Sequence, residues 1–139
     1  MKRLTTALLV IALLGALAGC SFGAKSSEAA QTIEITTASM AFGTKELTLQ
    51  KGKTYKLVIK NNDTVEHDFS IDEIPVKIAE EGHKGGHGAG QKTPDLHVHA
   101  EAGKTESVVF TPTESGTYTF YCTVAGHKEA GMVGKLIVQ

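Results

Sequence analysis

Short stretches in which apolar and polar residues alternate run along the chain from position 32 to its end. An alternation with a period of two is typical of β-strands that bury one face. Gly, Asn, Asp, Pro and Ser separate these stretches, and no long stretch has the period of a helix. The predicted strands are residues 32–37, 45–49, 54–60, 68–71, 107–111, 117–121 and 133–138.

About seven or eight short strands within residues 32–139 predict an all-β domain, an antiparallel β-sandwich. Residues 80–94 interrupt the pattern because they are rich in Gly and charge and have no apolar face to bury. We expect a long loop there. In the segment that follows, residues 96–99 alternate again, which places His97 and His99 on the same face of a strand.

The beginning of the chain has the pattern of a secretory signal peptide over residues 1–19. Two basic residues precede an apolar run at positions 7–18, which is too short to span a bilayer stably. A buried helix or a short membrane anchor is the alternative interpretation. The Leu-Ala-Gly-Cys sequence ending at Cys20 resembles the lipobox of bacterial lipoproteins, which implies cleavage before Cys20 and lipidation of its sulfur. Residues 20–31 are expected to be a flexible tether.

The part that follows position 19 has 12 Lys against 15 acidic residues and no Arg or Trp, so no basic surface for nucleic acid is expected. If Cys20 is lipidated, Cys122 is the one remaining thiol of an exported domain. A lone thiol outside the cell is a liability unless it is buried or bound to a metal.

Cys122, His127 and Met132 follow one another at intervals of five residues between two predicted strands. All three side chains therefore lie on one loop at an end of the sandwich. Gly126 and Gly131 allow the tight turns that bring thiolate, imidazole and thioether toward one point.

A second imidazole has to come from elsewhere, and His67 fits because it follows a turn and opens a predicted strand. A thiolate, two imidazoles and a weak thioether form the ligand set of a trigonal copper site with a long axial Met. Taken singly, each of these residues is better explained by packing or solvation. Their joint spacing favours a metal site.

The sequence Glu66-His67-Asp68-Phe69, together with the Cys-x4-His-x4-Met loop, resembles the cupredoxins, the type 1 blue-copper electron carriers of the plastocyanin and auracyanin kind. The resemblance covers residues 32–139. It implies an eight-stranded Greek-key sandwich, one copper ion that alternates between Cu(I) and Cu(II), and electron transfer between membrane complexes or to a soluble reductase. It also implies the ligands His67, Cys122, His127 and Met132.

Two related copper centres fit less well. A binuclear centre needs a second cysteine in the loop, where Gly126 stands. A multicopper oxidase needs a His-Cys-His sequence, which Tyr121-Cys122-Thr123 lacks.

The neighbours of the expected ligands also have expected roles. Strand alternation points Asp68 away from His67 and points Phe69 the same way as His67. By resemblance, His127 presents its ring edge at the surface, and electrons enter and leave there. The expected apolar surroundings are Val124, Ala125, Ala130 and Met132.

Four further histidines, His83, His87, His97 and His99, could hold a second metal ion or collect copper. The alternative, which we favour, is a polar loop that contains histidines without a metal function, because no carboxylate or thiol is obviously placed to complete a shell. A protein that stores or delivers copper is thus the second functional hypothesis. An enzyme ranks last, since it needs an open coordination position or a second redox centre.

The prediction is therefore a non-enzymatic electron carrier, lipid-anchored on the periplasmic or extracellular face of a membrane. It would act on redox partner proteins and on no small-molecule substrate.

Overall fold

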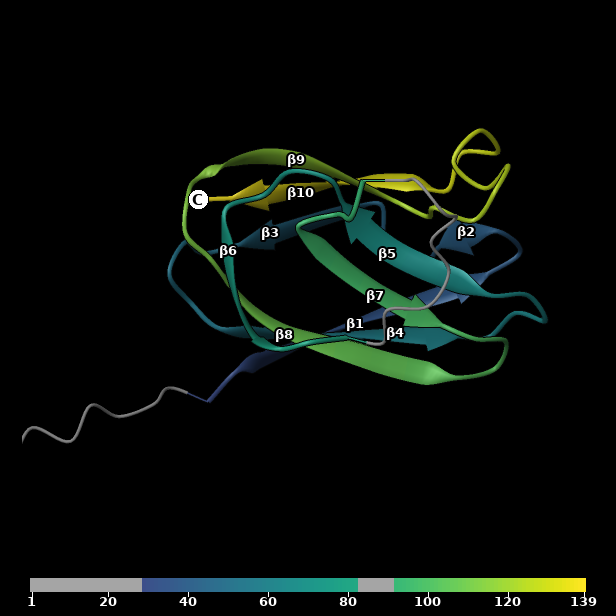
Figure 1. Ribbon diagram of the computed structural model, residues 1–139, viewed down its shortest axis with the longest axis horizontal. Coiled ribbons are helices and arrows are strands. Elements are labelled where there is room, and N and C mark those ends of the chain that lie inside the picture. The colour runs from purple at the N-terminus through teal and green to yellow at the C-terminus, as the bar shows by residue number, and fades with distance from the viewer. Residues whose placement is uncertain (1–28, 83–91) are drawn as a thin grey trace, which may run out of the picture.

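Two five-stranded β-sheets pack face to face around an apolar core in the computed structural model of the chain (Figure 1). The structure describes residues 29–82 and 92–139, and no helix occurs within them. None of the described residues therefore belongs to a helix long and apolar enough to span a bilayer. The predicted fold class, an all-β sandwich, is confirmed.

The first sheet consists of β1 (Gln31–Ala38), β2 (Ala41–Phe42), β4 (Tyr55–Asn61), β6 (Val76–Glu80) and β8 (Thr105–Pro112). Their order in the sheet is β2-β1-β4-β8-β6. The β1 and β4 strands are parallel, and the other neighbours are antiparallel.

The second sheet consists of β3 (Glu46–Leu49), β5 (His67–Ile71), β7 (Leu96–Ala100), β9 (Gly116–Tyr121) and β10 (Val133–Val138). Their order is β3-β10-β9-β5-β7. Here β3 and β10 are parallel, and the other pairs are antiparallel.

All seven strands predicted from alternation occur, with ends that differ by at most two residues. The strand inferred from the alternation at residues 96–99 occurs as β7, and the structure adds β2 and β6. Two of the strand pairs are parallel, so the sandwich is mixed. Alternation reports which face of a strand is buried but not the direction of its neighbour, which is why these pairs were not foreseen. The predicted 80–94 loop begins one residue later, because Glu80 is the last residue of β6. Positions 81–82 and 92–94 are outside strands, and positions 83–91 lie outside the described residues.

Three phenylalanine rings pack in the core close to one end of the second sheet, and we call Phe42, Phe69 and Phe120 the Phe cluster. The Phe69 and Phe120 rings stack with centroids 4.6 Å apart, and Phe42 meets both edge-on. Gly134 is the partner of Phe120 across β9 and β10. The Phe120 ring occupies the space that a Cβ at position 134 would need, so a residue larger than glycine does not fit there. Close packing of this kind fixes the strands that carry the candidate site.

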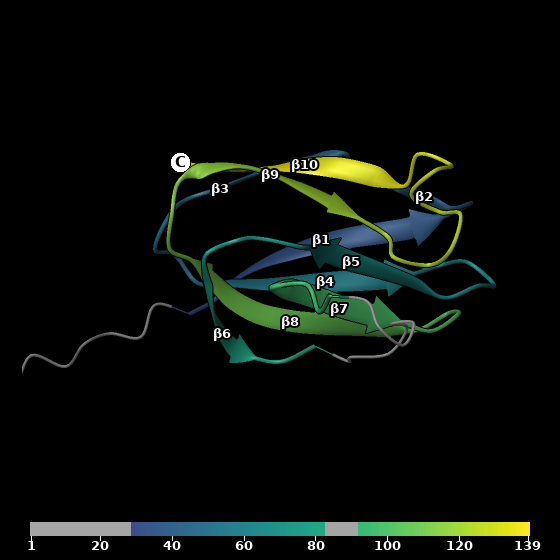
Figure 2. The ribbon, with the colours of Figure 1, turned by 45° about the horizontal axis from the view of Figure 1, so that its top comes forward.

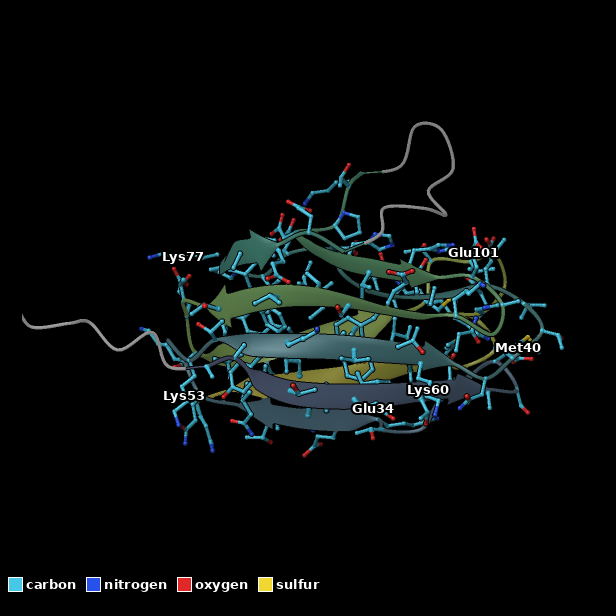
Figure 3. The ribbon with its side chains drawn as sticks, turned by 90° about the horizontal axis from the view of Figure 1, so that it is seen from below. Glu34, Met40, Lys53, Lys60, Lys77 and Glu101 are labelled. Carbon is cyan, nitrogen blue, oxygen red and sulfur yellow. The ribbon has the colours of Figure 1, made fainter. Side chains whose placement is uncertain are left out.

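The loop between β9 and β10 projects from one end of the sandwich, opposite to the C terminus (Figures 1 and 2). His67 opens β5 and Cys122 follows β9, so both lie at this end, which we call the site end. Met40 and Glu101 mark the site end in Figure 3, whereas Lys53 and Lys77 mark the opposite end.

Candidate metal centre

Three potential metal ligands converge at the site end. The Cys122 Sγ atom lies 3.9 Å from His67 Nδ1 and 3.5 Å from His127 Nδ1. The two imidazole rings are tilted by 48° with centroids 4.9 Å apart. His67 and Cys122 are fully buried, and His127 is 8% exposed. In residues 29–82 and 92–139 this is the one group of three or more Cys, His or acidic side chains whose ligand atoms all lie within 4.8 Å of one another.

The loop between Cys122 and Met132 is held by its own backbone. The Cys122 N–H donates to the Met132 carbonyl at 3.1 Å, and the Met132 N–H donates to the His127 carbonyl at 2.9 Å. Gly126 and Gly131 have φ of 83° and 94°, the left-handed conformation expected from the sequence. The loop thus brings His127 back to the thiol that precedes it.

Met132, the last residue of the Cys-x4-His-x4-Met motif, lies in the core. Its side chain is fully buried in the apolar core together with Cys122. The hydrogen bonds described above join its backbone to Cys122 and to His127. A buried thioether on this loop has the chemistry of a weak axial ligand.

The Cys122 thiol is protonated in the metal-free protein. Burial raises its pKa to about 11, and the negative charge of Asp68 acts in the same direction. The Asp68 backbone N–H opposes this by donating to the sulfur at 3.4 Å. A metal ion that binds the thiolate therefore has to displace a proton.

Asp68 is fully buried, and its carboxylate contacts Thr123 and His97 rather than the neighbouring His67. Its carboxylate accepts hydrogen bonds from the backbone N–H of Thr123 at 2.7 Å and from the Thr123 hydroxyl at 2.5 Å. Ser70 Oγ donates to the same carboxylate, and His97 Nε2 lies 3.7 Å away. Burial alone would raise the pKa of Asp68, but the contacts with His97 and Thr123 outweigh it and lower the pKa. Asp68 thus ties β5 to the first residue of the loop.

His97 and His99 lie on the same outward face of β7, as the alternation predicts, and both are buried. His97 faces Asp68, and His99 Nε2 lies 3.5 Å from Glu66 Oε2. Carboxylates are therefore near these imidazoles, which the sequence did not reveal. His83 and His87, like Cys20, lie outside the described residues.

A second carboxylate near the candidate ligands was also missed. Asp63 Oδ2 lies 3.2 Å from His67 Nε2, on the far side of the ring from Cys122. Hydrogen bonds from Thr64 N–H, His67 and Met40 N–H lower the pKa of Asp63. The spacing of four residues before His67 in a turn was the one available sequence signal.

The donor set fits copper. Two imidazole nitrogens and one thiolate around a common point, with a thioether nearby, form the ligand chemistry of mononuclear blue-copper sites. A single cysteine in the group leaves no second thiolate for a binuclear centre.

Residues 8–138 match the cupredoxin-like domain family. The chain belongs to the cupredoxin family. This cupredoxin is 32% identical to auracyanin-A of Chloroflexus aurantiacus over 161 aligned positions that cover 98% of this chain and 99% of that protein. It is 28% identical to the copper-resistant cuproprotein CopI of Pseudomonas aeruginosa over 179 positions, which cover 99% of this chain and 98% of CopI.

Among solved structures, the cupredoxin resembles dithionite-reduced auracyanin from Roseiflexus castenholzii with a TM-score of 0.61 and 26% identity, covering 81% of this chain and 99% of that one. The copper cofactor expected from the sequence agrees with this family and with the donor set at the site end.

Proposed function

We propose that this cupredoxin carries single electrons on one copper ion held by His67, Cys122, His127 and Met132. The observation that supports this most is the approach of two imidazole Nδ1 atoms to one buried thiol, at 3.9 and 3.5 Å. Bound copper supplies a Cu(I)/Cu(II) couple.

The surroundings of the donors favour fast electron transfer. Thiolate and thioether favour Cu(I), while imidazole suits both oxidation states. His67 lies two residues before Phe69 on β5, and Cys122 lies two residues after Phe120 of β9. Because Phe69 and Phe120 stack in the core, core packing fixes the positions of both donors. Donors that are held in one arrangement need little rearrangement when the charge of the ion changes.

His127 is the proposed point of electron entry and exit, because it is the most exposed of the three clustered donors. Val124, three positions before His127, is half-buried, and Ala125 and Ala130 on the same loop are exposed. An apolar rim around a ring edge suits short-lived docking of redox partner proteins, which we propose are membrane electron-transfer complexes.

A second function, storage or delivery of copper, is favoured by the similarity to CopI over nearly the whole chain. His97 and His99 add imidazoles close to the site through Asp68 and Glu66. A delivery protein has to release Cu(I) to an acceptor, whereas an electron carrier has to retain the ion through many redox cycles.

One set of measurements separates the two functions. The purified protein receives one equivalent of Cu(II), followed by absorption and EPR spectroscopy and repeated voltammetric cycles. An electron carrier gives an intense thiolate-to-Cu(II) band and keeps its copper through the cycles in the presence of a Cu(I) chelator. Loss of copper to the chelator within a few cycles favours delivery, and the absence of any visible band contradicts the proposed site.

We further propose that residues 1–19 are removed on export and that lipidated Cys20 anchors the domain outside the cytoplasm through a tether that ends where β1 begins at Gln31. Expression in a bacterium with radiolabelled palmitate tests this proposal. Label on the wild-type chain but not on Cys20→Ser supports it, and equal labelling of both contradicts it.

A further inference from the structure

The imidazole of His67 lies between the donor cluster and a carboxylate. Its Nδ1 atom faces Cys122 Sγ at 3.9 Å, and its Nε2 atom faces Asp63 Oδ2 at 3.2 Å. The His67 side chain is fully buried, whereas that of Asp63 is 20% exposed. The two nitrogens of one ring therefore have different partners.

Asp63 is held in this position by backbone hydrogen bonds. Its Oδ1 atom accepts from the Thr64 N–H at 2.9 Å, and its Oδ2 atom accepts from the Met40 N–H at 3.2 Å. Its own N–H donates to Asn61 Oδ1 at 2.9 Å. Because these contacts already fix the turn, the carboxylate loses little conformational entropy when it accepts a hydrogen bond from the imidazole.

Asn61 in turn connects this turn to its neighbours. The two N–H groups of the buried Asn61 amide are shared among three backbone carbonyl oxygens within hydrogen-bond distance, and its oxygen also accepts from Thr37 Oγ1. The carbonyl groups belong to Val65, Ala100 and Glu101. Asn61 thus links the turn that carries Asp63 to β1, to the end of β7 and to Glu101, the residue that follows β7.

We propose that Asp63 is a positioning residue that selects the reactive nitrogen of His67 and biases the copper site toward Cu(II). A carboxylate that accepts from Nε2–H leaves the lone pair of Nδ1 free for a metal. The Asp63 carboxylate also makes the His67 imidazole a more basic ligand. Its negative charge stabilises Cu(II) more than Cu(I), because Cu(II) has the higher charge. This inference rests on the proposed copper function.

The charge effect is tested with three variants and the wild-type protein at one neutral pH. Asp63→Asn removes the charge at constant size, and Asp63→Ala also removes the hydrogen-bond acceptor. Glu101→Gln is the control, because Glu101 is an exposed acid at the same end of the sandwich (Figure 3), and its hydrogen bonds to other described residues run through its backbone carbonyl.

We expect Asp63→Asn to lower the ratio of Cu(II) affinity to Cu(I) affinity about tenfold, the lower end of the effects seen for partners of ligating histidines. For a one-electron couple this corresponds to a reduction potential higher by about 59 mV. Glu101→Gln should change the ratio less than about twofold, because the charge of Glu101 is screened by solvent. An unchanged ratio in Asp63→Asn, or an equal change in Glu101→Gln, overturns the proposal.

The positioning effect is measured without copper, by ¹⁵N NMR of the histidine rings in the metal-free protein. His67 should carry its proton on Nε2 in the wild-type protein, and Asp63→Ala should show a mixture of both tautomers. A proton on Nδ1 in the wild-type protein overturns the inference. If the wild-type protein takes up no copper, the proposed function fails, and the NMR result alone decides the role of Asp63.

Discussion

The backbone N–H of Asp68 donates a hydrogen bond to the sulfur of Cys122, 3.4 Å away, across the boundary between β5 and the loop after β9. The carboxylate of Asp68 accepts two hydrogen bonds from Thr123, the residue that follows Cys122. One acidic residue thus holds the thiol through its backbone and the start of the loop through its side chain.

Thr123→Val should therefore destabilise the fold. The substitution removes the hydroxyl that donates to a buried carboxylate, and such a charge-assisted hydrogen bond contributes about 1.5–3 kcal/mol. Urea denaturation of the metal-free protein measures the loss. Thr113→Val is the control, because the Thr113 hydroxyl donates to the Pro75 carbonyl at an exposed position. Equal losses in the two variants would contradict the importance that we assign to Asp68.

Copper uptake should release a proton from Cys122. Because the pKa of the buried thiol is raised to about 11, the metal-free protein retains this proton at pH 8, and thiolate ligation has to expel it. We expect release of about one proton per ion in a weakly buffered solution. Cys122→Ser should abolish both the release and the visible absorption band.

The same shift predicts the pH dependence of stability. The folded thiol holds its proton more tightly than the unfolded thiol, whose pKa is near 9.0. The unfolded state therefore loses this proton first as the pH rises, and unfolding becomes easier between about pH 9 and pH 11. Chemical denaturation of the metal-free protein should show this decline, and Cys122→Ser should show less of it. A decline of the same size in both proteins would exclude Cys122 as its source.

Gly134→Ala should lower the free energy of unfolding more than a glycine substitution that strains only the backbone. A Cβ at position 134 would overlap the Phe120 ring and disturb the Phe cluster, an overpacking effect of about 1–3 kcal/mol. Gly103→Ala is the control, since Gly103 has a positive φ of 69° but open space around it, so only conformational strain of about 1 kcal/mol is expected. Thermal unfolding measures both variants, and the broader EPR spectrum of a disordered site should accompany only Gly134→Ala.

Replacing either His67 or His127 by glycine should remove a copper ligand, but added imidazole should be able to take the place of only one of them. His127 is 8% exposed, so His127→Gly should open the site to external ligands and regain a visible band when imidazole is added. His67 is fully buried, and His67→Gly should regain little. Equal recovery of both variants, or an unchanged spectrum in His127→Gly, would show that the assignment of these ligands is wrong.

The convergence of Cys122 and His127 could be predicted because both lie on one short loop whose glycines set its turns. The approach of His67 to Cys122 could be predicted from the ligand chemistry that the loop requires. Alternation in the sequence also placed Asp68 on the opposite face of β5 from His67.

The carboxylates around the site could not be predicted in the same way. Asp68 lies on the outward face of β5, where polar residues are normally solvated, but it is buried and contacts His97 of β7 and Thr123 of the loop. The contact between Asp63 and His67 depends on the shape of a turn that Asn61 holds. Such contacts arise from tertiary structure, and the hydrophobic pattern does not record them.

His67 and Cys122 are 55 positions apart in the chain. A single ion can bind both only when folding has brought them together, so copper stabilises the folded chain by an amount that grows with the copper concentration. The metal-free form is then the one that unfolds first and that proteases degrade first. The amount of this protein would in that case follow the supply of copper, with no regulatory component beyond the chain itself.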